Sequence, residues 1–387
     1  MTGVLNGVRV LELGQVLAGP FAGAILADLG AEVIKLERVE GGDDARQMGP
    51  AFRHGDALNF QVFNRGKQSV ALDLKSAEGR AAFERLAADA DIFIHNLRPG
   101  VPAALGIDGP ALCARHPRLV YAEISAFGST GPMAMSPGYE PLVQAFSGLS
   151  STNGGPDDPP MRSAASMCDQ GSGMWAVIGA LALLQRRHQT GRGGIVQTSL
   201  LETALVWNGQ KADAYVNEGR LPVRDRSGHP GFVPYEAFET QNGPLLICCG
   251  NDRLFAKLAA ALGRSDWVAD PRFASNRARL AHKAALLAEL APLLQAKPRA
   301  QWIETFEAAG VPCAPIHSVP EALAHPQVQA LGMLAPVPGE DFSLTALPLL
   351  LDGQRPALRS AAPRLGEHNA QHHIPPLSQA HTNKETP

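Results

Sequence analysis

Cysteine is scarce in this chain of 387 residues, and its placement supports neither a disulfide framework nor a metal site. The five cysteines, at positions 113, 168, 248, 249 and 313, are odd in number and lack the paired spacing of zinc ligands. Such cysteine usage is typical of proteins in a reducing compartment. We therefore expect free thiols, no metal ion and a cytoplasmic location.

The chain also lacks an excess of positive charge. Its 34 Lys and Arg residues are outnumbered by 37 Asp and Glu residues, which gives a formal net charge of -3. Nonspecific nucleic-acid binding normally depends on a strongly basic surface. We expect no nucleic-acid partner, and any polyanionic ligand must be held by a local group of cations.

Long hydrophobic runs are absent as well. The most apolar segment, residues 174–184, is shorter than the roughly 20 residues that cross a bilayer, and it is typical of a buried core helix. The first residues lack a basic region followed by an apolar block, so we expect neither a targeting segment nor a membrane partner. With 45% hydrophobic residues, the chain can nevertheless bury a large core spread over two or three domains.

The first part of the chain alternates between strand-like and helical segments. Apolar and β-branched runs are interrupted by helical patterns near residues 21–29 and 77–88. The strand-like runs are residues 8–13, 32–37, 92–96 and 119–124. This rhythm predicts an α/β fold with a Rossmann-like parallel sheet covered by helices over residues 1–220.

The composition changes after about residue 219, where a Gly-, Pro- and Arg-rich linker begins. Asn242-Gly243 then predicts a hairpin turn between two strands. Helical patterns follow near residues 252–262, 277–295 and 299–309. We expect a smaller α+β domain over residues 225–320. Residues 371–387 lack periodicity and are expected to form a disordered tail.

Asp169 draws attention because it precedes Gly-Ser-Gly and a long apolar helical pattern. The positive end of a helix dipole should keep a nearby carboxylate ionised at neutral pH, and an ionised Asp can attack a thioester carbonyl. An Asp in this position is also an ordinary helix N-cap. Composition alone leaves both interpretations open.

A dinucleotide site is disfavoured despite the Rossmann-like pattern. Gly14, Gly19 and Gly23 follow the first strand, but their spacing, interrupted by Pro20, differs from the tight G-x-G-x-x-G that brings backbone to a pyrophosphate. The function of the fold must therefore be argued from other residues.

Nearly a dozen short blocks, in order along residues 8–368, resemble the class III CoA-transferases, the family of carnitine and formyl-CoA transferases. They include VRVLELGQVLAGPFAGAILADLGAEVIKLERVEGGD, NRGKQSVALDLKSAEGR, GYEPLVQAFSGL, CDQGSGMWAVIGALALLQRR and PRLGEHN. The resemblance implies that residues 321–370 return to the large domain. It also implies that two ring-shaped chains interlock as a homodimer.

The same resemblance implies roles for particular residues. Asp169 would be the nucleophile. The expected CoA and substrate contacts are Val16, Arg38, Leu72, Asp73, Leu74, Lys75, Asn96, Leu97, Arg98, Tyr139 and Glu140. Arginine suits the phosphates of CoA because its fork makes two charge-assisted hydrogen bonds. Leu17 and Ala104 depart from the Gln and Arg of formyl-CoA transferases, so formyl transfer is not expected.

The reaction implied by the resemblance moves coenzyme A from an acyl-CoA to a free carboxylic acid. CoA and its thioesters are substrates, and no permanently bound cofactor is expected. Asp169 would pass through a mixed anhydride and an aspartyl-CoA thioester. Gly171 and Gly173 are expected to leave room for substrate and for backbone N-H donors to an oxyanion. Succinyl-CoA as donor and a small dicarboxylate as acceptor are our expectation.

Two alternatives remain at this point. An α-methylacyl-CoA racemase would use Asp169 for proton transfer with a His at the position of Tyr139, and tyrosine, with an unperturbed pKa near 10, is a poor general base at neutral pH. A catalytically silent CoA-binding scaffold would need Asp169 to be only a helix cap.

Overall fold

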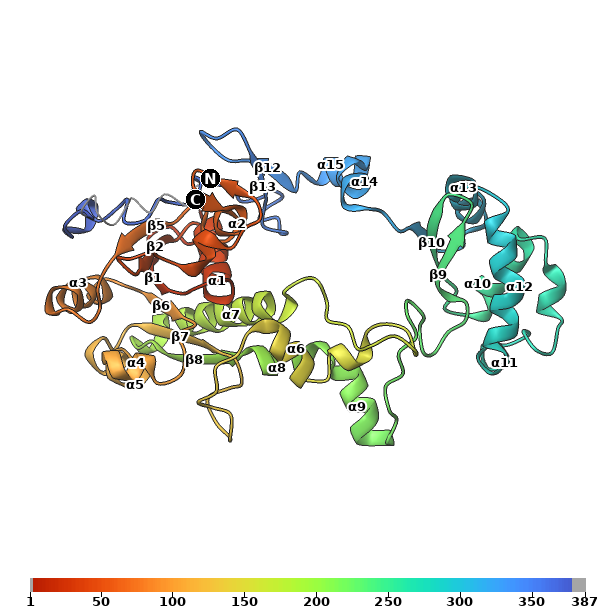
Figure 1. Cartoon of the computed structure of the whole chain (residues 1–387), viewed down its shortest axis with the longest axis horizontal. Helices are drawn as coiled ribbons and strands as arrows, with labels where there is room; N and C mark the ends of the chain where they lie inside the picture. Colours follow the sequence, from red (N-terminus) through yellow and green to blue (C-terminus); the bar gives the residue numbers. More distant parts are fainter. Residues whose placement is uncertain (1–2, 378–387) are drawn as a thin grey trace. The chain divides into compact units, whose positions relative to one another are not determined.

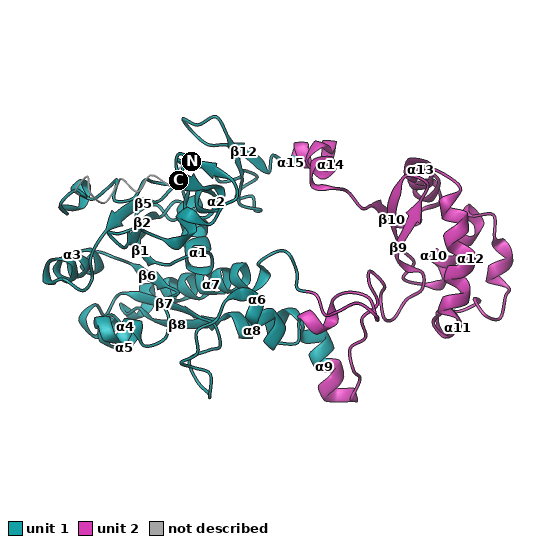
Figure 2. Cartoon of the chain, viewed as in Figure 1, with its two compact units in different colours: residues 1–149, 162–213, 331–387 teal, residues 150–161, 214–330 magenta. Residues whose placement is uncertain are grey.

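The computed structural model describes residues 3–377, which form two compact units. Unit 1 contains the residues up to 149, residues 162–213 and the residues from 331 on, and unit 2 contains residues 150–161 and 214–330 (Figure 2). The domain limits expected at 225 and 320 stay predictions. Within the segment expected to be a disordered tail, Ile374 is buried in the unit 1 core, and residues 378–387 lie outside the described part.

Unit 1 is built on a six-stranded sheet in which every neighbouring pair of strands is parallel. The strands are β1 (Arg9–Leu13), β2 (Glu32–Glu37), β5 (Gln68–Ala71), β6 (Ile92–His95), β7 (Val120–Ser125) and β8 (Gly194–Ser199). Their order, β5-β2-β1-β6-β7-β8, is that of doubly wound dinucleotide-binding sheets. The predicted α/β class with a parallel sheet is confirmed.

Helices cover both faces of this sheet, because successive strand residues point to opposite sides. Val10 packs in one cluster with α1 (Ala18–Asp28) and α7 (Met167–Thr190), and Leu11 packs in another with α3 (Ala77–Ala88) and α5 (Gly109–Arg115). Helices α1 and α7 contact each other on the same face of the sheet (Figure 1). Both faces of the sheet are therefore covered, as is typical of parallel sheets.

The remaining elements of unit 1 are short. They are β3 (Phe52–Arg53), β4 (Asp56–Ala57), α2 (Leu58–Asn64), α4 (Val101–Leu105), α6 (Glu140–Phe146), α8 (Leu200–Trp207), β12 (Leu334–Pro336) and β13 (Ser343–Thr345), with 3-10 turns at Asp44–Gln47 and Ala370–His372. Helix α9 (Gly209–Glu218) crosses from unit 1 into unit 2.

Helix α7 is longer than the sequence pattern indicated. It begins at Met167 rather than near 174, and its 24 residues are long and apolar enough to cross a membrane by length and composition. However, Ala176, Val177 and Ala180 are buried against α1 and the sheet. A core helix passes the same test of length and composition, and the packing of α7 is that of a core helix.

Unit 2 holds a three-stranded antiparallel sheet in the order β11-β10-β9. Its elements are a 3-10 turn at Ser150–Thr152, β9 (Tyr235–Thr240), β10 (Gly243–Cys248), α10 (Asp252–Ala261), a 3-10 turn at Ser265–Val268, α11 (Asn276–Ala281), α12 (Lys283–Gln295), α13 (Arg299–Ala309), β11 (Cys313–Pro315), α14 (Val319–Ala324) and α15 (Pro326–Leu331). The turn predicted at Asn242-Gly243 joins β9 to β10. The single helix predicted over 277–295 is wrong, because the chain breaks at His282 between α11 and α12.

Candidate active site

The loops that leave the carboxyl ends of β1, β2, β5 and β6 carry all of the CoA contacts expected before residue 100. Parallel strands end at one edge, so these loops gather there, and ligands of doubly wound sheets bind at that edge where the strand order reverses. The reversal here lies between β1 and β6. Val16 follows β1, Arg38 follows β2, Leu72 to Lys75 follow β5, and Asn96 to Arg98 follow β6.

Three cations at this edge are accessible to a polyanionic ligand. The side chain of Arg38 is 54% exposed, although its Nε and Nη2 donate to the Gly42 carbonyl and it pairs with Asp44. Lys75 and Arg98 are exposed. This placement fits the expected phosphate contacts, since it leaves charged groups at the rim of an otherwise apolar sheet.

Asn96 connects two of these loops, and its expected contact with CoA stays a prediction. Its Oδ1 accepts from Gln15 N at 2.8 Å, and its Nδ2 donates to the Gln15 carbonyl at 2.8 Å. The side-chain amide thus joins the loop after β6 to the loop after β1. Asn96 fixes the geometry of that loop, which carries Val16.

Asp169 lies in the first turn of α7, at the same edge of the sheet. Helix α7 connects β7 to the parallel β8, so it runs against the strands and begins at their carboxyl ends. Ser166 is the N-cap residue, and Asp169 is the third residue of the helix. The interpretation of Asp169 as the N-cap is therefore wrong.

The carboxyl group of Asp169 is less acidic than expected. Burial, followed by the negative charge of Glu140, raises its pKa to about 7. The expectation that Asp169 is ionised at neutral pH is therefore met only in part, because burial and the Glu140 charge favour the protonated form. Near neutrality the group is divided between its protonated and ionised forms.

Glu140 is the buried neighbour responsible for part of this shift. It is the first residue of α6 and is 4% exposed. Its Oε1 accepts from Gln144 Nε2 at 2.6 Å and from Cys168 N at 3.4 Å, whereas its Oε2 has no hydrogen-bond partner among the described residues. A second carboxylate therefore stands beside Asp169 with one oxygen unpaired.

Gln144 was missed by the sequence reasoning. It is fully buried, and its Oε1 also accepts from Ser163 N at 2.7 Å, so it ties α6 to the segment that leads into α7. The available signal was its spacing of four residues from Glu140, which places the two side chains on one face of a helix. Tyr139, by contrast, is the N-cap of α6 and is 63% exposed.

The two glycines expected to leave room for substrate serve helix packing instead. A Cβ added at Gly171 would lie 2.6 Å from Thr203 Cγ2, and one added at Gly173 would lie 2.7 Å from the Ala18 carbonyl oxygen. That expectation is wrong: both glycines let neighbouring helices approach α7 closely. The contact at Gly173 brings the start of α1 to within about one helical turn of Asp169.

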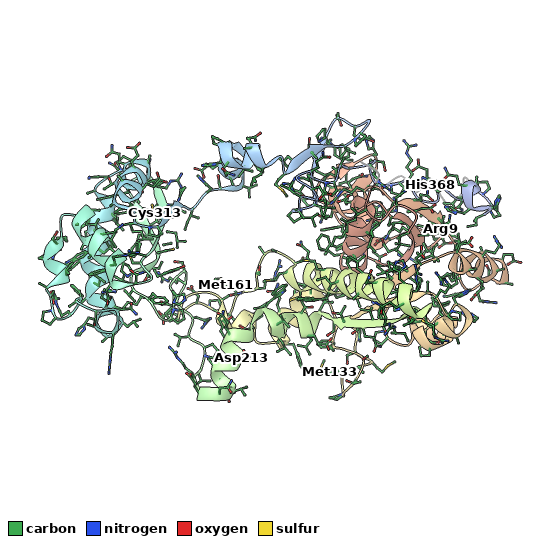
Figure 3. The ribbon with its side chains drawn as sticks, turned by 180° about the vertical axis from the view of Figure 1, so that it is seen from behind. Arg9, Met133, Met161, Asp213, Cys313 and His368 are labelled. Atoms are coloured by element: carbon green, nitrogen blue, oxygen red, sulfur yellow. The ribbon has the colours of Figure 1, made fainter. Side chains whose placement is uncertain are left out.

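Cys168 does not compete with Asp169 as a nucleophile. Burial, with the nearby Glu140 and Asp169 charges, raises the pKa of its thiol to about 12, so it stays protonated and unreactive. All five cysteines are free in the part of the chain that the structure describes, including Cys313 in unit 2 (Figure 3). The thiol next to Asp169 in the sequence therefore offers no alternative to the carboxylate.

Two polar cavities of unit 1 lie elsewhere. One, of about 380 Å³, is lined by residues that include Arg9, and the other, of about 370 Å³, by residues that include His368. Figure 3 labels both residues. Neither cavity is lined by a residue expected to bind CoA or to react, so neither suggests a different site.

Comparison with known proteins identifies the family of the chain. Residues 5–369 match CoA-transferase family III. The chain is 38% identical over 370 residues to acetyl-CoA:oxalate CoA-transferase of Acetobacter aceti, covering 95% of this chain and 94% of the relative. It is 37% identical over 376 residues to succinate–glutarate CoA-transferase of Agrobacterium fabrum, covering 95% and 94%.

A solved structure shares the fold. The crystal structure of a CaiB/BaiF family protein from Brucella suis superposes with a TM-score of 0.88 at 35% identity, covering 96% of this chain and 99% of that one. Similarity in sequence and in structure therefore extends over nearly the whole molecule. The chain belongs to CoA-transferase family III and is a class III CoA-transferase.

Proposed function

We propose that Asp169 is the nucleophile that carries coenzyme A from an acyl-CoA to a free carboxylic acid. The observation that carries the proposal is the position of Asp169, which is partly buried in the first turn of α7. The loops with Arg38, Lys75 and Arg98 lie at the same edge of the sheet. A thioester held by those cations through its phosphates would extend toward the start of α7.

The reaction proceeds through four acyl transfers. An Asp169 oxygen attacks the thioester carbonyl, the C-S bond breaks, and a mixed anhydride and CoA thiolate form. The thiolate attacks the Asp169 carbonyl carbon and releases the first acid, leaving an aspartyl-CoA thioester. The acceptor carboxylate then displaces the thiolate to form a second anhydride. Attack of the thiolate on the acceptor's carbonyl gives the new acyl-CoA and restores the Asp169 carboxylate.

The electrostatics of Asp169 suit this role. A carboxylate whose pKa lies near the working pH is more basic than an ordinary one and is still ionised in a substantial fraction of molecules. The neighbouring charge of Glu140 helps to set that balance. No metal or bound cofactor is needed for these steps, because both intermediates are activated acyl groups.

We assign succinyl-CoA as the donor and a small dicarboxylate, such as glutarate, mesaconate or itaconate, as the acceptor. Support comes from the relatives, several of which are named for succinyl-CoA or succinate, with glutarate, citramalate or malate as the other acid. A panel of acyl-CoA donors and acids, read by chromatography, tests the assignment. Turnover of acetyl-CoA with oxalate, but not of succinyl-CoA with any dicarboxylate, would contradict it.

We further infer a homodimer, of the interlocked type suggested by the resemblance, working in the cytoplasm. The structure supports an interface because large apolar side chains of α6, α7 and α8 are exposed. They include Leu142, Phe146, Trp175, Ile178 and Val206. Light scattering should give twice the mass of the chain, and a monomer at micromolar concentration would refute the dimer.

Trapping the covalent intermediate tests the nucleophile. The enzyme is incubated with acyl-CoA, treated with hydroxylamine or borohydride, and mapped by mass spectrometry. We expect an adduct on Asp169, none in Asp169→Asn, and a normal adduct in Asp89→Asn, which changes an exposed carboxylate at the end of α3. An unmodified Asp169 would favour a scaffold, and α-proton exchange in deuterated water without acyl transfer would favour a racemase.

A further inference from the structure

Val16 has a backbone conformation that its side chain disfavours. Its φ is +64°, in the left-handed region that β-branched residues rarely adopt, because Cβ crowds the neighbouring backbone there. The other non-glycine residues with positive φ in the described part of the chain are His54, Arg226, Asp352 and His373, none of which is β-branched. Such strain persists only where surrounding contacts impose it.

Two side chains from other loops impose this conformation. Asp43 Oδ1 accepts from Val16 N at 2.9 Å and from Ala45 N at 2.9 Å. On the preceding residue, Asn96 pairs with both backbone groups of Gln15. The chain between β1 and α1 is thus held from both sides, and Asp43 is the group that contacts the strained residue itself.

Asp43 is held in turn by Lys35, which lies in the middle of β2. Lys35 Nζ lies 2.9 Å from Asp43 Oδ2 in an ion pair, 3.0 Å from Glu12 Oε1, and donates to the Gly14 carbonyl at 2.9 Å. Lys35 and Asp43 are 0% and 2% exposed. Burial alone would lower the pKa of Lys35 and raise that of Asp43, but the opposite charges reverse both shifts, so both groups stay ionised.

A buried ion pair of this kind is poor evidence for stability, since apolar residues of similar volume often stabilise a core as well or better. The pair is better explained by the geometry that it fixes. Lys35 contacts the loop at Gly14 and, through Asp43, at Val16. It therefore sets the path of the chain at two points between the end of β1 and the start of α1.

We infer that Lys35 and Asp43 are positioning residues that hold Val16 in its left-handed conformation and so shape the CoA-binding loop of residues 14–17. The inference rests on the proposed function and on the contact of Val16 with CoA that the family resemblance implies. The loop leads directly into α1, whose first residue, Ala18, packs against Gly173 of α7. A change in the loop would therefore reach the first turns of α7, which carry Asp169, without touching the nucleophile.

A double-mutant cycle tests the inference. Asp43→Ala, Val16→Gly and the double variant are compared by calorimetric titration with CoA, together with their thermal unfolding. Asp43→Ala should weaken CoA binding by about tenfold, because Val16 relaxes from its strained conformation. Its effect should shrink to less than about threefold in the Val16→Gly background, because glycine adopts positive φ without strain.

The conservative variant Asp43→Asn adds a second readout. It keeps an oxygen acceptor for Val16 N, while an amide NH2 replaces the carboxylate oxygen that pairs with Lys35, so it should bind CoA more tightly than Asp43→Ala but less tightly than the parent enzyme. It also keeps the experiment informative if Asp43→Ala fails to fold. Equal losses in both backgrounds, or a lower melting temperature with unchanged CoA affinity, would overturn the inference and leave Asp43 a purely structural residue.

The failure of the proposed function is distinguishable from the failure of this inference. CoA affinity is measured without turnover, so the double-mutant cycle gives its result even if Asp169 is not the nucleophile. Conversely, at saturating acyl-CoA the Asp43→Ala variant should still form the Asp169 adduct. An adduct in the parent enzyme, together with an additive cycle, would retain the proposed function and reject only the positioning role.

Discussion

Buried charged residues differ in their surroundings between the two units. In unit 1, Lys35 and Asp43 form an ion pair beside a strained loop at the ligand edge of the sheet. In unit 2, the fully buried Arg279 donates to the carbonyls of Val233 and Phe273 and pairs with Asp252. These two sets of buried charges therefore contact different parts of the backbone: Asp43 contacts the strained residue Val16, whereas Arg279 joins loops around the unit 2 core.

Replacement of Arg279 should give the largest change in stability. Arg279→Met leaves the carbonyls of Val233 and Phe273 without their donor, which should lower the free energy of unfolding by about 2 to 4 kcal/mol. Denaturant unfolding followed by circular dichroism measures the loss. CoA affinity should stay within about twofold of the parent value. If Arg279→Met instead weakened CoA binding as much as Asp43→Ala, the contrast between the units would fail.

The pH dependence of catalysis sharpens the account of the ligand edge. Because the pKa of Asp169 is about 7, kcat/KM should fall about tenfold per pH unit below that value and level off above it. Glu140→Gln removes the neighbouring negative charge, so the acidic limb should move to lower pH. Initial rates between pH 5 and 9 measure the shift, and Glu202→Gln, on α8, is the control. An unmoved limb would show that Glu140 does not act on Asp169.

The raised pKa of Asp169 also makes stability depend on pH. The pKa of Asp169 is higher in the folded chain than the value of about 4 in an unfolded one, so folding favours the protonated form. From about pH 4 to pH 7 this group lowers stability as pH rises. Asp169→Asn removes that loss, so its melting temperature relative to the parent should increase between pH 4 and pH 8. A constant difference would contradict the raised pKa.

Local patterns predicted the sheet and the hairpin well, because apolar runs such as residues 32–37 and the Asn242-Gly243 turn are signals carried by neighbouring residues. The start of α7 was not predicted, because it depends on contacts with distant residues and not on a local pattern. Gly171 and Gly173 are poor helix formers, and only their contacts with α8 and α1 explain a helix there. Tertiary packing overrode local propensity.

The position of Asp169 in the chain was visible in the sequence, but its chemistry was not. Its raised pKa depends on burial and on Glu140, 29 positions earlier, and no local pattern reports either. The strain at Val16 depends on Asp43 and, through it, on Lys35. A lysine in the middle of the apolar strand EVIKLE was the available signal, since an unpaired lysine is almost never fully buried.

In the proposed reaction one carboxylate, Asp169, bonds covalently to the acyl group and then to CoA. The transfer rate of Asp169→Asn, with the parent enzyme's best donor and acceptor, tests this role. We expect a loss of at least about a thousandfold in kcat, because an amide cannot form the anhydride, with CoA affinity retained. A variant that transfers CoA as fast as the parent enzyme would contradict a covalent role for Asp169.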